Sequence, residues 1–342
     1  MIGKKELLSE ILYPSGILSW LSNRLVGKLI VYNYHRLKSE NDNEKMQYDE
    51  DVFGPKVSVF KKQIKWLKLN TRIISESELI QFIETSRFPK QICSMITFDD
   101  GYIDNYTLAY PILKDEDVPA IFFIPSNTIN NRFLGWWDIV SYFLKNTIKD
   151  FIIFDGETIF VKSCYNKAKQ FFLQKFKLEP YEKTIQLLNK LSIACDVPFP
   201  DICIQGLELM NWDQIKEISN SCITIGSHTH NHHVLATLNE KKQLEELKTS
   251  MQVIQSHIGN SVNSLSYPVG GYEHFSSITQ ENVKKCGYKL AFSFNTGFNK
   301  WKYIHNLNIK RVSPSDKKTL FSATTLLPEL FLNDRNFNLN NL

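Results

Sequence analysis

Short apolar runs rich in β-branched and aromatic residues recur along the chain, and segments with a helical spacing of apolar positions separate them. Seven runs are predicted to be strands, at residues 29–34, 92–98, 120–125, 222–225, 264–267, 289–294 and 309–312. Helices are expected between them, at 57–69, 75–85, 105–114, 212–219, 240–258 and 277–286. Strands that alternate with helices predict an α/β fold with a largely parallel sheet. Seven strands favour a closed or nearly closed barrel, although an open doubly wound sheet would also fit.

The region from residue 131 to residue 211 interrupts this alternation. Residues 151–160, FIIFDGETIF, are typical of two short strands joined by an Asp-Gly turn. Helical patterns follow at 167–176 and 181–193. We interpret this region as a hairpin-and-helix insertion that packs beside the barrel mouth and shapes substrate choice. The other predicted segments are an N-terminal helical segment (1–27), the barrel (28–130 and 212–315) and a C-terminal tail (316–342).

The composition is that of a globular protein with a sizeable core. Of 342 residues, 43% are hydrophobic and 22% are charged, which excludes collagen and a chain disordered throughout. The formal net charge is only +4 and no dense basic run occurs, so we predict no nucleic-acid partner. The six cysteines form no C-x-x-C pair, and we expect reduced thiols rather than a zinc ribbon.

Residues 1–35 contain no long uncharged apolar stretch, because Glu6, Glu10, Arg24 and Lys28 interrupt them. We therefore predict neither a signal peptide nor an integral membrane span. The expected location is cytoplasmic, with peripheral attachment to a membrane through an amphipathic helix as an alternative. The sequence indicates no particular oligomeric state.

Two polar clusters follow predicted strands and are the first candidates for chemistry. Asp99, Asp100 and Gly101 come directly after the strand at 92–98. A plain Asp-Gly turn would explain them without function. However, the next segment has a helical pattern, and the carboxyl ends of barrel strands are where such folds carry their active sites. Adjacent carboxylates also repel each other unless a cation or a shared proton relieves them.

The second cluster, GSHTHNHH at residues 226–233, holds four of the eight histidines. His228 and His232 are four residues apart, a spacing that suits a metal-binding pair. Together with Asp100 they would provide two imidazoles and one carboxylate and leave a position for water. That donor set is typical of a hydrolytic zinc site. We interpret His230 and His233 as supporting or surface residues.

His35, Tyr267 and Arg311 also close predicted strands. Each has an ordinary explanation when taken alone, namely a strand-end histidine, a turn residue and a salt bridge. In a parallel barrel, however, these strand ends meet Asp99 and His228 on one face. We therefore expect all five residues at one site. No G-x-G-x-x-G or phosphate-loop motif occurs, so nucleotide binding has no support.

The segments TFDDG at 97–101 and GSHT-x-x-H at 226–232 resemble the first two motifs of polysaccharide deacetylases, the NodB-homology family or carbohydrate esterase family four. The resemblance covers about residues 28–130 and 211–315. It implies a distorted (β/α) barrel with about seven parallel strands. It also implies that Asp99 is the general base. It further implies one divalent metal ion, with zinc favoured, whose ligands are Asp100, His228 and His232.

The sequence departs from the family pattern in two places. Ser266 stands where typical members carry an arginine before a Pro-aromatic-Gly turn, and Arg311 is the candidate to replace it. The late strand that supplies the general acid is not evident near the C-terminus, whereas LIVYNYH, ending at His35, occurs near the start. This arrangement resembles the circularly permuted branch of the family, and it implies His35 as the acid.

The expected function is metal-dependent removal of N-acetyl groups from amino sugars of a polysaccharide or its biosynthetic intermediate. Asp99 would deprotonate the attacking water, and His35 would protonate the departing amine. A backbone N–H near Tyr267 would help the metal to stabilise the oxyanion. Two alternatives are a catalytically silent carbohydrate-binding protein on the same scaffold and a deformylase that acts on a sugar amide. In each case the partner is a carbohydrate.

Overall fold

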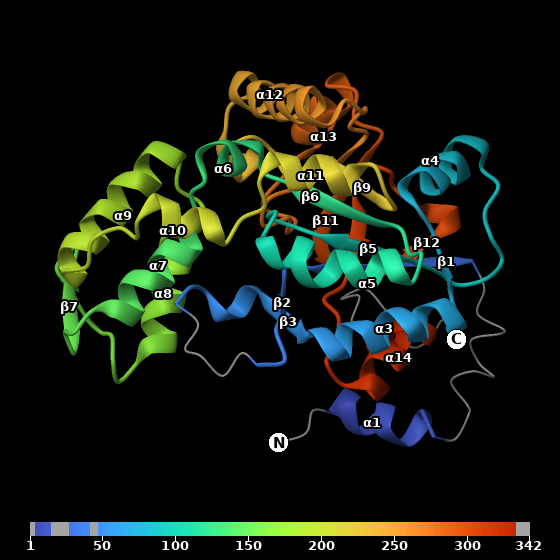
Figure 1. Ribbon diagram of the computed structural model, residues 1–342, viewed down its shortest axis with the longest axis horizontal. Coiled ribbons are helices and arrows are strands. Elements are labelled where there is room, and N and C mark those ends of the chain that lie inside the picture. The colour runs from blue at the N-terminus through green and yellow to red at the C-terminus, as the bar shows by residue number, and fades with distance from the viewer. Residues whose placement is uncertain (1–3, 15–26, 42–46, 333–342) are drawn as a thin grey trace.

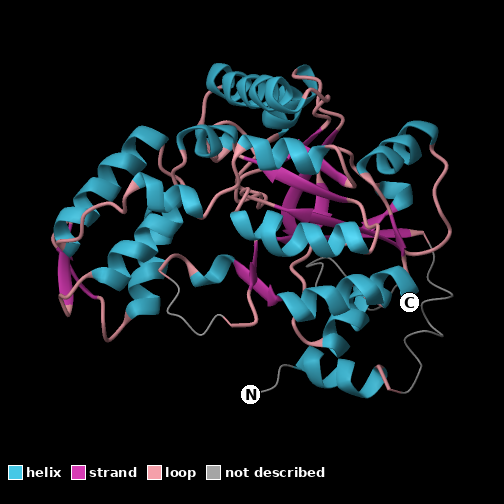
Figure 2. Ribbon diagram, in the orientation of Figure 1, coloured by secondary structure: helices cyan, strands magenta, loops and turns pink. Residues whose placement is uncertain are grey.

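The computed structural model describes residues 4–14, 27–41 and 47–332. Within these residues, nine strands form one sheet, and helices cover its outer surface (Figures 1 and 2). The strands are β1 (Lys28–Tyr34), β4 (Arg72–Ile73), β5 (Cys93–Phe98), β6 (Ala120–Ile124), β9 (Ile223–Ser227), β10 (Ser264–Ser266), β11 (Leu290–Thr296), β12 (Asn299–Lys300) and β13 (Ile309–Arg311). Their order is β12-β1-β5-β6-β9-β10-β11-β13, and β4 pairs with β5.

The sheet is nearly closed into a barrel. Every pairing from β1 through β5, β6, β9, β10 and β11 to β13 is parallel. Val312, directly after β13, pairs back with β1, because its N–H donates to the Val31 carbonyl at 2.9 Å and its carbonyl accepts the Asn33 N–H at 3.0 Å. Among the nine described strands of this sheet, only β12 lies antiparallel to its neighbour, β1. The expected distorted (β/α) barrel is confirmed.

The predicted helices form where apolar positions recur at helical spacing. They are α3 (Val57–Asn70), α4 (Glu76–Thr85), α5 (Tyr110–Asp115), α11 (Trp212–Ser219), α12 (Glu240–Ile258) and α13 (Ser277–Lys285). Ser75 and Asn211 begin α4 and α11 with capping boxes, which satisfy N–H groups of the first turn. A compact apolar cluster inside the barrel includes Val31, Met95 and Phe292, which come from three different strands.

The region from residue 131 to residue 211 forms a mainly helical lobe beside the barrel, at the left of Figure 1. It contains α7 (Trp136–Asn146), the antiparallel hairpin of β7 (Phe151–Phe154) and β8 (Glu157–Phe160), α8 (Tyr165–Lys177), α9 (Tyr181–Cys195) and α10 (Ile202–Leu207). The expected hairpin-and-helix insertion is therefore confirmed. Its helices α7 and α10, and the short helix α6 (Ser126–Asn131) before it, are additional to the prediction.

The two ends of the described chain pack together below the barrel in Figure 1. The helix α1 (Lys4–Leu12) lies against α14 (Lys318–Leu326), where Ser9 Oγ bonds with Thr319 Oγ1 at 3.3 Å. Phe321 of α14 stacks on Tyr32 of β1 with ring centres 4.7 Å apart. Residues expected as a C-terminal tail thus form α14 and α15 (Pro328–Phe331), because their apolar side chains are buried. Residues 1–3, 15–26 and 333–342 of the two predicted terminal segments lie outside the described residues.

A smaller parallel pair, β2 (Arg36–Lys38) and β3 (Phe53–Lys56), lies beside the carboxyl end of β1. A turn of 3-10 helix at Glu50–Val52 directly precedes β3. None of the described helices is both long enough and apolar enough to cross a bilayer.

Candidate active site

The TFDDG segment leaves the carboxyl end of β5 in a sharp turn. Asp100 has φ 75° and Gly101 has φ 71°, both in the left-handed region. A Cβ on Gly101 would lie 3.2 Å from Ile129 and 3.3 Å from Ile124, so conformation and space both favour glycine. Such a conformation is uncommon for a residue like Asp100 and is typical of functional sites. The turn brings the buried carboxylates of Asp99 and Asp100 to one cavity.

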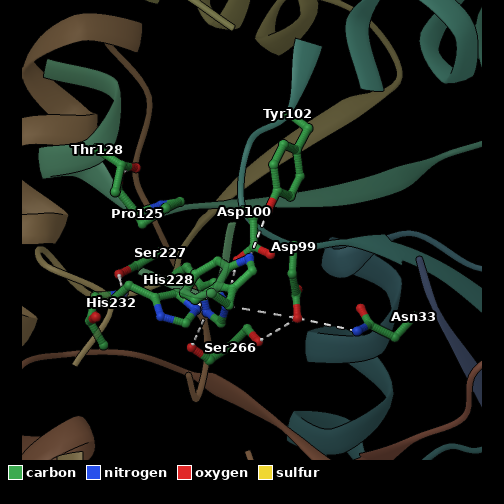
Figure 3. Close-up of polar contacts among 12 residues, drawn as sticks. Asn33, Asp99, Asp100, Tyr102, Pro125, Thr128, Ser227, His228, His232 and Ser266 are labelled. Atoms are coloured by element: carbon green, nitrogen blue, oxygen red, sulfur yellow. Dashed lines mark hydrogen bonds and ion pairs between the residues drawn. The ribbon is translucent and has the colours of Figure 1, made fainter. Parts of the chain in front are cut away.

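Asp100, His228 and His232 bring three potential metal ligands together (Figure 3). Asp100 Oδ1 lies 3.5 Å from His228 Nε2 and 3.4 Å from His232 Nε2. Tetrahedral zinc with bonds of about 2.0–2.1 Å holds neighbouring ligand atoms about 3.3–3.4 Å apart, so the spacing fits. Asp100 Oδ1 is buried and has no hydrogen-bond partner among the described residues. Burial without a hydrogen-bond partner is expected of a carboxylate oxygen that binds a cation.

The two histidine rings are oriented for this role. His228 follows β9, and its Nδ1 hydrogen bonds with the Ser266 carbonyl at 2.8 Å, which directs Nε2 toward Asp100. The His228 and His232 rings meet edge to face, with centres 4.6 Å apart. Burial lowers the pKa of His232, which favours the neutral imidazole that metals bind.

The loop that carries His232 is held from outside by α12. Glu246 Oε2 accepts the backbone N–H groups of His230 at 3.1 Å and Asn231 at 2.8 Å. The other carboxylate oxygen lies 3.2 Å from His233 Nδ1. Ser250 Oγ donates to the carbonyl of the residue after His228 at 3.0 Å. His230 and His233 therefore lie outside the ligand cluster, and sequence reasoning missed Glu246 and Ser250, which look like ordinary positions of an amphipathic helix.

Asp99 is fixed by a bidentate ion pair with Arg311. The two guanidinium nitrogens lie 2.8 Å from the two carboxylate oxygens, and both side chains are almost fully buried. Ser266 Oγ accepts from Arg311 at 2.8 Å and donates to Asp99 at 3.3 Å. Asn33 Nδ2 also donates to Asp99, at 3.2 Å. Although burial alone would raise it, the Arg311 charge holds the pKa of Asp99 below its usual range.

His35 and Tyr267 line the same 430 Å³ cavity as the carboxylates and histidines. The His35 ring stands edge-on to Phe294, with ring centres 6.0 Å apart. The Tyr267 hydroxyl donates to the Leu307 carbonyl, and its backbone N–H donates to the Phe292 carbonyl, both at 3.0 Å. The structure thus brings all the expected site residues to one cavity, namely His35, Asp99, Asp100, His228, His232, Tyr267 and Arg311. Because its N–H is engaged in the sheet, an oxyanion donor near Tyr267 has to be another N–H group.

The insertion forms the opposite wall of this cavity. Trp136 and Trp137 of α7 and Leu173 and Lys177 of α8 line it. The Trp137 ring packs against the ring of His232, with centres 4.5 Å apart. The expected position of the insertion beside the barrel mouth is confirmed, whereas its influence on substrate choice stays a prediction.

A buried hydrogen-bond chain joins this wall to the TFDDG turn. Trp137 Nε1 donates to the Tyr102 hydroxyl at 2.9 Å, and that hydroxyl donates to Asp138 Oδ2 at 2.7 Å. The backbone N–H of Asp49 donates to the other oxygen of Asp138 at 3.0 Å. Burial raises the pKa of Asp138 to about 7. None of these residues was predicted to belong to the site. The sequence feature that could have indicated them is the Trp-Trp-Asp segment directly after Gly135.

The sequence pattern that defines the polysaccharide deacetylase family matches residues 87–291. The chain belongs to the polysaccharide deacetylase family. Members of this family are hydrolases that act on N-acetyl amide bonds. Both motifs, at 97–101 and 226–232, fall within the matched residues, whereas His35 and Arg311 lie outside them.

Individual relatives agree with this membership. The chain is 22% identical to the polysaccharide deacetylase-family protein YxkH of Bacillus subtilis (strain 168) over 307 residues, which are 89% of this chain and 78% of YxkH. It is 29% identical to the poly-β-1,6-N-acetyl-D-glucosamine N-deacetylase of Staphylococcus aureus (strain MSSA476) over 119 residues. That match spans only 33% of this chain and 41% of the staphylococcal protein.

Two solved structures share the deacetylase fold. Streptococcus pyogenes deacetylase PplD, in complex with acetate, matches with a TM-score of 0.58 and 16% identity over 88% of this chain and 99% of PplD. IcaB from Ammonifex degensii matches with a TM-score of 0.55 and 16% identity over 88% of this chain and 97% of IcaB. At 16% identity, these two structural matches support the fold alone.

Proposed function

We propose that this chain is a metal-dependent hydrolase that removes N-acetyl groups from amino sugars of a polysaccharide or of its biosynthetic intermediate. One observation carries the proposal. A buried Asp-His-His cluster with metal-ligand spacing lies beside a second carboxylate that an arginine keeps ionised. This pairing separates a ligand carboxylate from a base carboxylate, although the two are adjacent in the sequence.

Asp100, His228 and His232 would hold the divalent cation, and two imidazoles with one carboxylate favour zinc. Bound there, such a cation supplies Lewis-acid polarisation of water and of the amide carbonyl. Asp99 Oδ2 lies 3.9 Å from His228 Nε2, so the base stands next to the ligand cluster. Since Arg311 keeps Asp99 ionised, its carboxylate can accept the proton of the attacking water.

His35 would donate a proton to the departing amine, because it lines the cavity from the barrel side without belonging to the ligand cluster. For the oxyanion, the next N–H after Tyr267 is that of Val269, since Pro268 has none. Val269 lines the cavity and has φ 60°, an uncommon conformation for a β-branched residue. One well-placed donor of this kind contributes about 3–4 kcal/mol to transition-state stabilisation.

The substrate assignment rests on the family and on the staphylococcal relative, whose name specifies an N-acetylglucosamine polymer. The match to that relative covers less than half of either chain, so the polymer itself is part of the proposal. A cytoplasmic location, which the proposal includes, would place the enzyme on a biosynthetic intermediate rather than on an exported glycan. The circular permutation implied by the position of His35 also stays a prediction.

The test measures acetate release from a panel of N-acetylated oligosaccharides, with and without a chelator. Asp99→Asn should retain the metal and lose several orders of magnitude in turnover, whereas Asp100→Asn should lose the metal as well. Asp115→Asn, at the end of α5, is the control and should behave as the wild type. Acetate release that survives both the chelator and Asp99→Asn would refute the proposal. Glycan binding without hydrolysis would favour the silent scaffold, and formate release the deformylase.

A further inference from the structure

A second cavity, of 260 Å³, adjoins the proposed metal site. The two cavities share four wall residues, Trp136, Trp137, Lys177 and His232. His232 is one of the three proposed metal ligands, so the second cavity borders the proposed metal site. The function proposed above does not use this space.

The lining of the second cavity is mainly apolar and comes largely from the insertion. Ile139 of α7, Phe176 of α8 and Leu188 of α9 contribute buried side chains. Leu134, before α7, and Val234, after the His232 loop, complete the buried apolar wall. The cavity therefore lies where the insertion meets the barrel, beside the metal-ligand loop.

Gln205 and three threonines of this lining already have partners within the protein, whereas His232 Nδ1 is buried and has no hydrogen-bond partner among the described residues. Both ends of the Gln205 amide bond to backbone groups, at 2.8 and 2.9 Å. The hydroxyls of Thr128, Thr184 and Thr237 donate to backbone carbonyls at 2.7, 3.2 and 2.8 Å. At the buried apolar part of this cavity, a sugar ring would lose its hydrogen bonds to water without gaining equivalent ones, whereas a hydrocarbon chain needs none. Lys177 and Glu179 add charge to the lining, and Lys177 stands at the junction with the metal site.

We propose that the second cavity binds a short hydrocarbon chain carried by the substrate whose amide lies at the metal site. The inference rests on the proposed function, because it assumes an amino sugar beside Asp99. The chain is either an N-acyl group longer than acetyl or an alkyl group linked to the sugar, and both present the same chemistry to the cavity. Each methylene that leaves water is expected to improve binding about threefold to fourfold.

Hydrolysis of a longer N-acyl group requires no new reactant. Water adds to the amide carbonyl, the carbon–nitrogen bond breaks, and the products are a carboxylic acid and the sugar amine. The proton lost by water and the proton needed by the amine pass through the groups already assigned to those roles. The cavity changes only which acyl or alkyl chain the site accepts.

The first experiment measures kcat/KM of the metal-loaded full chain on two substrate series. One series carries N-acetyl, N-butanoyl or N-hexanoyl groups on the same amino-sugar oligosaccharide. The other keeps the N-acetyl group and changes a methyl glycoside to a hexyl glycoside. We expect a rise of roughly tenfold or more along one series, consistent with several buried methylenes. A rise in the first series identifies the acyl chain and a rise in the second the alkyl linkage, whereas flat profiles in both would overturn the inference.

A variant that fills the cavity tests its location. Ile185 of α9 lines the cavity and is 38% exposed, so a larger side chain there can enter the space from its rim. Ile185→Trp should bring the long-chain to short-chain ratio of kcat/KM close to one. Ile193→Trp is the matched control, since Ile193 lies on the same helix, is 78% exposed and does not line the cavity. A wild-type ratio in Ile185→Trp would overturn the inference.

A binding measurement separates failure of this inference from failure of the proposed function. The protein is titrated with 1-hexanol while tryptophan fluorescence is recorded, because Trp136 and Trp137 line the cavity. A saturable change in the wild type that is lost in Ile185→Trp would support the cavity even if no amide were hydrolysed. No saturable change in an enzyme that releases acetate would overturn the inference and leave the proposed function standing.

Discussion

Two buried carboxylates, one on the barrel and one on the insertion, differ in charge because their partners differ. Asp99 faces the Arg311 guanidinium with two contacts of 2.8 Å, and its pKa lies below the usual range. Asp138 accepts hydrogen bonds from a phenol and a backbone amide, and burial raises its pKa to about 7. Both side chains are almost fully buried, so burial alone does not decide ionisation.

The two sides of the site cavity differ accordingly in the groups that they present. The barrel side carries the groups that can hold a cation and move protons, and its charge is fixed by an ion pair. The insertion side offers aromatic rings and a carboxyl group, Asp138, whose pKa of about 7 leaves it about half protonated at pH 7. That the barrel performs the chemistry and that the insertion shapes substrate choice both stay predictions.

The largest expected effect tests the barrel side. His35→Ala should leave metal content intact and lower turnover by roughly two to four orders of magnitude, because a departing amine needs a proton donor. Gln170→Ala, on the insertion wall of the same cavity, is the matched variant and should change turnover less than tenfold. Turnover and bound metal are measured for both. Equal losses in the two variants would contradict the division between barrel and insertion.

The next variant makes Asp99 resemble Asp138. Arg311→Met removes the buried cation, and we expect the free energy of unfolding at pH 7 to fall by about 3–5 kcal/mol. Without Arg311, burial should raise the pKa of Asp99, so the acidic limb of the pH–rate profile should move to higher pH. Urea unfolding and the profile of kcat/KM measure the two effects. Arg311→Lys, which keeps a charge, should show a smaller change in both, and an unmoved acidic limb in Arg311→Met would count against Arg311 as the partner that keeps Asp99 ionised.

A third variant removes the titration of Asp138. Its folded pKa of about 7 lies above the ordinary value of 3.8, so the folded state retains a proton that the unfolded state has lost between these values. The corresponding stability is complete below about pH 4 and is lost as the pH rises through 7, a change of a few kcal/mol. Asp138→Asn cannot titrate, so its free energy of unfolding should fall less than that of the wild type between pH 5 and pH 8. Parallel urea curves for the two proteins at both pH values would contradict the raised pKa.

The smallest expected effect concerns Tyr102. Tyr102→Phe removes a donor to Asp138 and an acceptor for Trp137, which should lower the free energy of unfolding by about 1–3 kcal/mol. Tyr106→Phe is the control on the same segment, because its hydroxyl bonds to Glu217 at the exposed surface. That change should cost less than about 1 kcal/mol. If both variants unfold at the same urea concentration, the buried chain does not stabilise the junction between barrel and insertion.

The sequence was sufficient to predict the barrel and the proximity of Asp100, His228 and His232, because both depend on local patterns. Each of the seven predicted strands exists in the structure, and TFDDG and GSHTHNHH follow two of them. Once parallel strands close, their carboxyl ends must meet, which brings Asp100 to His228 and His232. Arg311 was a candidate for the same reason, although its contact with Asp99 needed the structure.

The supporting residues could not be predicted, because their partners are set by packing between distant elements. Asp138 bonds with Tyr102 only because the fold brings the start of α7 beside the turn after β5. Glu246 holds the histidine loop from the middle of α12, where a glutamate is ordinary. The engaged N–H of Tyr267 depends on its pairing with Phe292 of β11, which the turn sequence does not reveal.

The ion pair between Asp99 and Arg311 joins residues that are 212 positions apart, and this separation has a consequence for biosynthesis. At roughly 5–20 residues per second, a ribosome adds Arg311 about 10–40 s after Asp99. Throughout that interval β1 has no β13 segment beside it, because Val312, which pairs with β1, has not yet been added. One edge of the nascent sheet is therefore available to other chains. Docking of the last strand then removes the open edge and delivers the guanidinium in a single step. A nascent chain that stops short of residue 311 therefore lacks both the segment that covers this edge of β1 and the guanidinium that faces Asp99.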